Sequence, residues 1–166
     1  MDAHREAPEP TTDRRQQLAL IESLDQLAEL VQRREDLYVR WSAGPDHDRV
    51  RTSKDELTGM PLPGLSANSL AVEDWWGDRS VRLWVARRLY DYHHLRGRRD
   101  PEARPWVMTA REIGRGPDNE TLVECLEPLS WVGDAVVAEA EDAVESVRGD
   151  WGPLDRSEPE AGRASP

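Results

Sequence analysis

The chain has 166 residues, a net charge of −11 and one cysteine, Cys125. This length is typical of a single domain, and such an acidic chain repels phosphate backbones, which argues against nucleic-acid binding. One cysteine excludes an internal disulfide and a zinc site built from several cysteines. The sequence has no run of about 18 apolar residues, so no membrane span is predicted. The N-terminus lacks the apolar core of a secretory signal. We therefore expect a cytoplasmic location.

Apolar residues concentrate in the middle of the chain, which predicts one folded domain with disordered ends. Residues 1–16 combine proline, threonine and scattered charge with little to bury, which is typical of a disordered lead. Residues 149–166 are rich in proline, glycine and serine, which is typical of a disordered tail. The single domain is expected over residues 17–148.

The first part of this domain predicts a strand, a helix and a second strand. Residues 17–22 alternate apolar and polar side chains, as a short strand would. Residues 23–35 have a helical apolar period, with Ser23 as the N-terminal cap and Gln26 at the capping-box position. Residues 37–41 alternate and are rich in β-branched and aromatic side chains, which favours a central strand.

The middle of the domain predicts a long loop followed by a helix. Residues 42–63 are polar and contain several prolines, so we expect a mobile or functional loop. Residues 64–70 fit either a short strand or an extended loop. Adjacent side chains on a regular element point apart, so one of Trp75 and Trp76 should pack inward and the other should lie near the surface. A helix capped by serine is expected over residues 80–95.

The C-terminal part predicts a hairpin and a last helix. Residues 106–113 and 120–127 read as strands joined by a glycine-containing turn, with Pro128 ending the second. An apolar stripe over residues 130–148 predicts a helix. The fold class is therefore α+β, with a small, mostly antiparallel sheet of about three to five strands and about three packed helices. Because the chain has seven tryptophans and no phenylalanine, tryptophan is expected to fill the large core volumes.

Charge is distributed unevenly along the chain. Residues 79–99 contain seven arginines and one acid, whereas residues 118–145 contain nine acids and no base. These segments either face each other or hydrate different sides of the domain, as charge runs usually do. The alternative is that the arginine-rich segment meets a small anionic ligand or an acidic protein partner.

The candidate histidine, glycine and cysteine residues do not form a recognisable metal, phosphate or thiolate site. His93 and His94 are adjacent and diverge on a helix, and Asp91 with His94 supplies only two ligands, so we predict no metal site. The glycines of residues 114–118 lie between two strands rather than before a helix, which favours a turn over a phosphate loop. Cys125 is expected to be a small buried apolar residue.

The ordered motifs LYVRWSAGP, LPGLSANSL followed by EDWW, WVARRLYDYHHL, PWVM, GRGPDNE and PLSWV resemble one family of uncharacterised bacterial proteins, a domain of unknown function. The resemblance covers roughly residues 18–147. It departs at Ala110, where a glycine is expected. This family implies no activity, substrate or site.

A weaker likeness concerns Arg40, Ser66 and Glu120. Their order along the chain is similar to the Arg, Ser, Glu order of ADP-ribosyltransferase-type folds. That resemblance implies an NAD-dependent enzyme in which Arg40 holds NAD phosphate or ribose and Ser66 positions the nicotinamide half. Glu120 would engage the ribose hydroxyl and stabilise positive charge at the breaking glycosidic bond.

The competing hypothesis is a non-catalytic interaction domain without a cofactor. Its candidate binding residues are Asn68, Trp75, Trp76 and Arg82, since a tryptophan pair beside an arginine-rich helix can line a binding groove. Its partner would be a protein or a small anionic ligand, and neither a nucleic acid nor a membrane.

Overall fold

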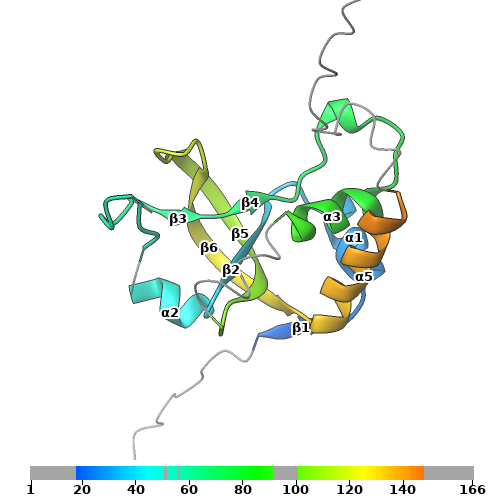
Figure 1. The fold of residues 1–166 in the computed structure, drawn as a ribbon, viewed down its shortest axis with the longest axis horizontal. Coiled ribbons are helices and arrows are strands. Elements are labelled where there is room, and N and C mark those ends of the chain that lie inside the picture. The colour runs from blue at the N-terminus through cyan, green and yellow to red at the C-terminus, as the bar shows by residue number, and fades with distance from the viewer. Residues whose placement is uncertain (1–17, 51, 56, 92–100, 148–166) are drawn as a thin grey trace, which may run out of the picture.

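The computed structural model describes residues 18–50, 52–55, 57–91 and 101–147 (Figure 1). The predicted disordered ends, the last turn of the predicted helix over 80–95 and the adjacent histidines lie outside these residues. In chain order the elements are β1 (Ala19–Ile21), α1 (Leu24–Arg33), β2 (Leu37–Ser42), α2 (Pro45–Val50), β3 (Leu65–Ser66), β4 (Asn68–Ser69), a 3-10 helix (Asp74–Trp76), α3 (Val81–Tyr90), β5 (Arg104–Arg115), β6 (Thr121–Val132) and α5 (Asp134–Ser146).

The strands form one mixed sheet of six strands in the order β1-β6-β5-β2-β4, with β3 also paired to β6. The α+β class is confirmed, and the β5–β6 hairpin and the near-central position of β2 are as predicted. The predicted sheet of three to five strands was too small. The sheet is mostly antiparallel, as predicted, but it is mixed because β1 runs parallel to β6. Strands of two or three residues carry too little periodicity to reveal their partners from sequence.

Helices α1, α3 and α5 cover one face of the sheet (Figure 1). Alternate β2 residues Leu37, Val39 and Trp41 are buried there in a core shared with α1, α3 and α5. Within the described part of the chain, no helix has the length and apolar character to cross a membrane.

The helix starts follow the capping chemistry expected from the sequence. Ser23 Oγ accepts the Gln26 N–H at 3.1 Å before α1, and Ser80 Oγ accepts the Leu83 N–H at 3.4 Å before α3. Each bond satisfies a backbone donor that has no partner within the first helical turn.

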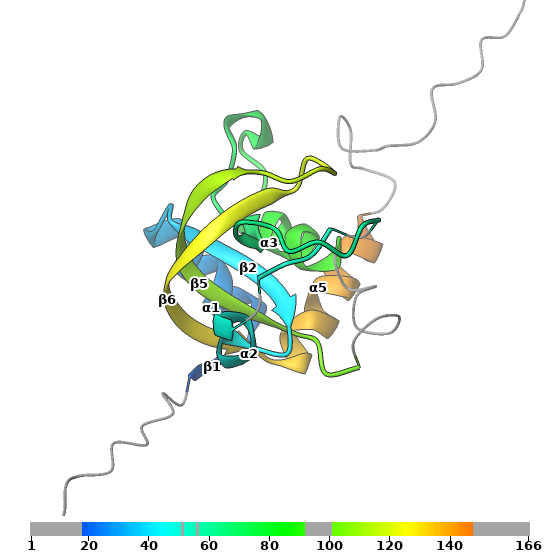
Figure 2. The same ribbon diagram turned by 90° about the vertical axis from the view of Figure 1, so that its left-hand side faces the viewer.

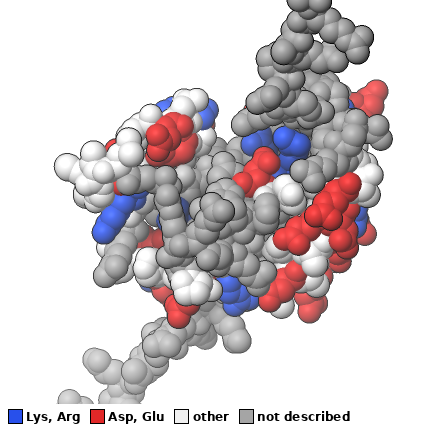
Figure 3. All heavy atoms as spheres, viewed as in Figure 1, with Lys and Arg blue, Asp and Glu red and all other residues white. Residues whose placement is uncertain are grey.

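Charge pairs join the three helices to one another. Arg82 on α3 contacts Asp25 of α1 at 2.9 Å and Glu139 of α5 at 3.6 Å. Acidic side chains gather over the side of the molecule that carries α5 (Figure 3). One arginine of the basic segment is therefore paired internally with the acidic C-terminal part, as the first reading of the charge pattern expected.

The sheet curls strongly (Figure 2), and a second, smaller core lies on its other face. Its members on β5 and β6 include Trp106, Met108 and Val123, with Leu65 of β3 packed against them. Arg40 is also on this face, because strand residues alternate and its neighbours Val39 and Trp41 face the helices. Any site involving Arg40 is thus separated from the three-helix layer by the sheet.

Strand β6 continues past Pro128, and the prediction that Pro128 ends this strand was wrong. Met108 pairs with Pro128 and Val107 pairs with Ser130, so Leu129 is an extra residue in a β-bulge. Proline is tolerated at bulges because its missing N–H need not enter the ladder. Helix α5 therefore begins at Asp134 rather than near residue 130.

The predicted loop over residues 42–63 contains a helix, α2, which the sequence reading missed. The helix begins with Pro45, whose fixed φ suits the first helical position, and Gly44 precedes it at φ +126°. A Cβ on Gly44 would lie 2.7 Å from the Trp131 ring, so only glycine fits this approach. The Gly-Pro pair reads as a breaker in sequence, yet here it starts a helix.

Candidate functional site

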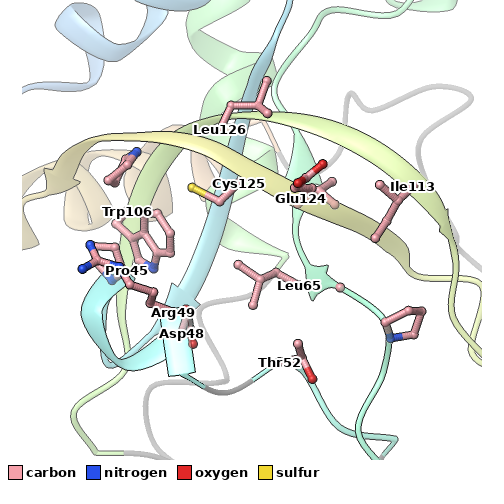
Figure 4. A pocket seen from close by; sticks show the side chains of 14 residues that line it. Pro45, Asp48, Arg49, Thr52, Leu65, Trp106, Ile113, Glu124, Cys125 and Leu126 are labelled. Carbon is pink, nitrogen blue, oxygen red and sulfur yellow. The ribbon is translucent and has the colours of Figure 1, made fainter.

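A cavity of about 600 Å³ lies between α2, the segment before β3 and the β5–β6 hairpin (Figure 4). Its apolar lining includes Leu65, Trp106, Ile113, Val123, Leu126 and Pro128. Its polar lining includes Asp48, Arg49, Thr52 and Glu124. The exposed lining is divided almost evenly between apolar and polar surface, and the volume falls within the usual range of ligand pockets.

Two β-bulges present apolar side chains to this cavity. The pairing shifts between Glu112 and Gly114, which leaves Ile113 without an opposite residue, and between Thr109 and Ala110, which leaves Leu126 as the extra residue of β6. A bulge redirects a side chain out of the regular alternation. Ile113 remains 42% exposed and Leu126 62% exposed.

Gly64 allows the chain before β3 to approach the hairpin closely. A Cβ at this position would lie 2.7 Å from Ile113 Cδ1 and 2.9 Å from the Val123 carbonyl oxygen. The carbonyl belongs to the backbone of β6 and cannot turn away. Glycine is therefore required for this side of the cavity to close as it does.

A buried ion pair supports the α2 side of the cavity. Arg40 Nε donates to Asp48 Oδ2 at 2.7 Å and Nη2 donates to Oδ1 at 3.3 Å. Arg40 Nη1 donates to Ser53 Oγ at 3.1 Å and to the Ser66 carbonyl at 2.7 Å. A two-pronged arginine–carboxylate contact fixes orientation as well as adding energy. It therefore holds α2, the following loop and β3 to β2.

The same network fixes the tryptophan in the cavity wall. Ser42 Oγ donates to Asp48 Oδ2 and accepts the Trp106 Nε1–H at 2.9 Å. It also accepts the Gly44 N–H at 3.1 Å. Because Trp106 is buried with its one polar atom satisfied, its ring is a rigid part of the wall.

Cys125 also lines the cavity, between Trp106 and Glu124 in the view of Figure 4. Burial raises the pKa of its thiol above the ordinary 9.0, and the Asp48 carboxylate adds to the rise while Arg49 opposes it. The thiol is therefore neutral and weakly nucleophilic at neutral pH. Partial burial and a raised pKa agree with the expectation of an unreactive, core-like cysteine.

We expect alkylation of Cys125 by iodoacetamide to be slower than that of an unfolded-chain thiol and to keep accelerating as the pH rises past 9.0, where the rate of the unfolded-chain thiol begins to level off. The thiolate is the reacting form, so the rate follows its fraction. Labelling measured by mass spectrometry from pH 7 upward checks this, with the urea-unfolded chain as the control. A native rate that levels off below pH 9 would contradict it.

The structure joins two of the three residues of the enzymatic prediction. Arg40 binds the backbone carbonyl of Ser66, as given above. Glu120 lies in the turn between β5 and β6, where its carboxylate accepts the Asp118 N–H at 2.9 Å. None of the three lines the cavity. Four hydrogen bonds occupy the Arg40 guanidinium.

The residues predicted for binding lie elsewhere in the fold. Trp76 is 1% exposed and Trp75 is 48% exposed, which confirms that only one of the adjacent indoles packs inward. Both contact Trp84 edge-to-face, with ring centroids 5.2 and 5.5 Å apart. Arg82 forms the helix-joining ion pairs, and Asn68 pairs with Val39 in the sheet. Of this set, Trp75 offers the largest aromatic contact surface.

Sequence reasoning missed Ile113 and Leu126. A signal for Leu126 was present, because Cys125 and Leu126 are adjacent apolar residues in a strand that otherwise alternates from Val123. Adjacent apolar residues within an alternating strand indicate a bulge. Within the ranges that the structure describes, no three histidine, cysteine, aspartate or glutamate side chains group as metal ligands.

Fold and cavity together define an α+β domain in which a curled mixed sheet carries three helices on one face and a cavity on the other. The chain belongs to the family of unknown function DUF6098, whose model matches residues 14–152. No curated protein and no solved structure matches the chain.

Proposed function

We propose that this domain is a non-catalytic binding module whose ligand occupies the cavity between α2 and the β5–β6 hairpin. The observation that carries the proposal is the pair of bulge residues, Ile113 and Leu126. Their side chains line the cavity and remain exposed although they belong to two long, paired strands. Exposed apolar side chains that gather at a hollow are typical of interaction sites.

The lining indicates the chemistry of the ligand. The walls suit an apolar group of the size of one or two large side chains, because Leu65, Trp106 and Val123 form them. Two of the charged residues at the cavity are largely exposed, Arg49 with a side chain 72% exposed and Glu124 with one 52% exposed. Charges this exposed orient a ligand more than they add to its affinity.

The enzymatic alternative has less support from the same geometry. A guanidinium that holds NAD phosphate needs free donors. The donors of Arg40 instead bind Asp48, Ser53 and the Ser66 carbonyl. The Glu120 carboxylate accepts the Asp118 N–H and so stabilises its own turn. These contacts explain both residues as parts of the scaffold, whereas the exposed apolar lining has no such role in the scaffold.

The binding proposal predicts that anilinonaphthalene sulfonate, a dye with apolar rings and one negative charge, binds the native protein with increased fluorescence. Leu126→Glu should raise the Kd of the dye about tenfold, because it places a charge in an apolar wall. Leu57→Glu is the matched control. It adds the same charge at a side chain that is 90% exposed and does not line the cavity.

Dye titration by fluorescence, with thermal melting of each variant, measures these effects. Equal dye affinity of the wild type and Leu126→Glu, with both folded, would contradict the use of this cavity. A loss of affinity in both variants would point to charge repulsion alone.

A further inference from the structure

Strand β6 has an outer edge that is paired at both ends and open in between. Leu122 and Val123 pair with β3, and Ser130, Trp131 and Val132 pair with β1. Across residues 124–129, no strand in the described part of the chain pairs with β6 on the side away from β5.

The ladder shows which backbone groups face this open edge. Ala110 donates its N–H to the Asp36 carbonyl at 3.2 Å, so its backbone groups face the β2 side. Opposite residues of an antiparallel pair either face each other or both face away. Cys125 is opposite Ala110, so its N–H and carbonyl face the open edge. No backbone partner for them is present among the described residues.

The same alternation applies at Pro128. Met108, two residues before Ala110 on β5, is opposite Pro128, so the Pro128 carbonyl also faces outward. Proline has no N–H, and prolines are found on open edges because they limit uncontrolled pairing. The edge therefore offers one donor at Cys125 and acceptors at Cys125 and Pro128, which suits a short strand.

The open edge borders the cavity. The cavity lining includes Glu124, Cys125, Leu126 and Pro128 of this edge. It also includes Leu65 of β3, which pairs with β6 just before the unpaired stretch. A strand laid along this edge places alternate side chains over the hollow. Backbone pairing and burial of an apolar side chain would therefore occur in one binding event.

We propose that an extended segment of a protein partner adds to this edge as a strand, with an apolar side chain in the cavity. The proposal rests on the proposed binding function and names its ligand class. Two of the six residues from 124 to 129 are the bulge residues Leu126 and Leu129, so about four residues of the partner pair here.

Charge favours a partner segment with basic residues beside its apolar one. Glu127 is exposed on this stretch of β6, beside Glu124, which pairs with Arg111, and the whole chain carries a net charge of −11. Complementary charge speeds and orients association more than it strengthens it. The occupant is thus an extended, basic peptide with a central apolar side chain.

The experiment uses the full chain and the acetylated, amidated probe peptide Lys-Thr-Val-Leu-Val-Thr-Lys. The amide proton of Cys125, followed by NMR, should exchange rapidly in the free protein and at least about tenfold more slowly when the peptide is saturating. A peptide that carries one N-methyl group on its central leucine or on the preceding valine tests backbone pairing. One of these two positions should weaken binding about tenfold and the other much less, because only alternate N–H groups enter a ladder.

Glu127→Lys tests the charge contribution. It should raise the Kd of the probe peptide about threefold without a change in melting temperature. Glu145→Lys, an exposed position on α5, is the control and should leave the Kd unchanged.

Three results would overturn strand addition. If Cys125 is already protected in the free chain, another segment of this protein occupies the edge. If the dye binds but the peptide leaves Cys125 exchange unchanged, the cavity takes a different ligand and the proposed function stands. If neither dye nor peptide binds, both proposals fail.

Discussion

Replacing Asp48 with asparagine should lower the free energy of unfolding by about 3–5 kcal/mol. The side chain of Asp48 is 3% exposed and that of its partner Arg40 is 14% exposed. The asparagine keeps the size but removes the charge, which leaves the guanidinium buried without its counter-charge. Ser42 also loses the carboxylate to which it donates.

Urea unfolding followed by tryptophan fluorescence measures this loss. The matched control is Asp46→Asn on the same helix, whose carboxylate contacts Arg49 at 3.4 Å with both side chains more than 70% exposed. An exposed pair of this kind contributes less than about 1 kcal/mol. Similar losses in the two variants would contradict the view that the buried pair holds α2 to the sheet.

The Asp48 change also affects the cavity, because Asp48 both supports its wall and forms part of its lining. Asp48 holds Arg40 and, through Ser42, Trp106, so its loss affects the wall before any ligand is present. Leu126→Glu changes the lining without touching this network. If Leu126→Glu weakens ligand binding, the ligand contacts the apolar lining. If only Asp48→Asn weakens it, binding depends on the network that supports the wall.

Much of the fold could be predicted because its signals are local. Ser23 and Ser80 begin helices through contacts within four residues, and the alternation from Leu37 to Trp41 identifies both faces of β2. The parts that were missed depend on distant partners. Pro128 stays in β6 because a bulge opposite β5 accommodates it, and β1 is a strand because β6 pairs with it.

The cavity could not be predicted for the same reason. Ile113 and Leu126 reach it only because of two of the three register shifts along the β5–β6 hairpin. Arg40 was singled out as a possible ligand contact because its order with Ser66 and Glu120 resembles that of ADP-ribosyltransferase-type folds. Its partner Asp48 lies on α2, which was predicted as a loop because a Gly-Pro pair usually interrupts regular structure.

The tryptophan cluster gives the second large effect, because Trp84 lies in the helix-side core and its ring contacts both Trp75 and Trp76. Trp84→Ala should lower the free energy of unfolding by about 3–5 kcal/mol, which is the usual cost of removing a buried aromatic ring. The ring is 3% exposed, and its Nε1–H donates to the Leu70 carbonyl at 3.0 Å. The substitution therefore opens a cavity and also leaves a buried carbonyl without its donor.

Trp75→Ala is the matched control, since this indole is half exposed and its Nε1–H bonds to exposed Glu73. We expect a loss of about 1 kcal/mol there, mostly from its edge-to-face contact with Trp84. Thermal melting should show a drop of roughly 10 °C for Trp84→Ala and of a few degrees for Trp75→Ala. Comparable drops would mean that Trp75 is also a core residue, and would weaken its case as a binding residue. A small drop for Trp84→Ala would contradict a core filled by tryptophan, because no phenylalanine is present to replace the lost volume.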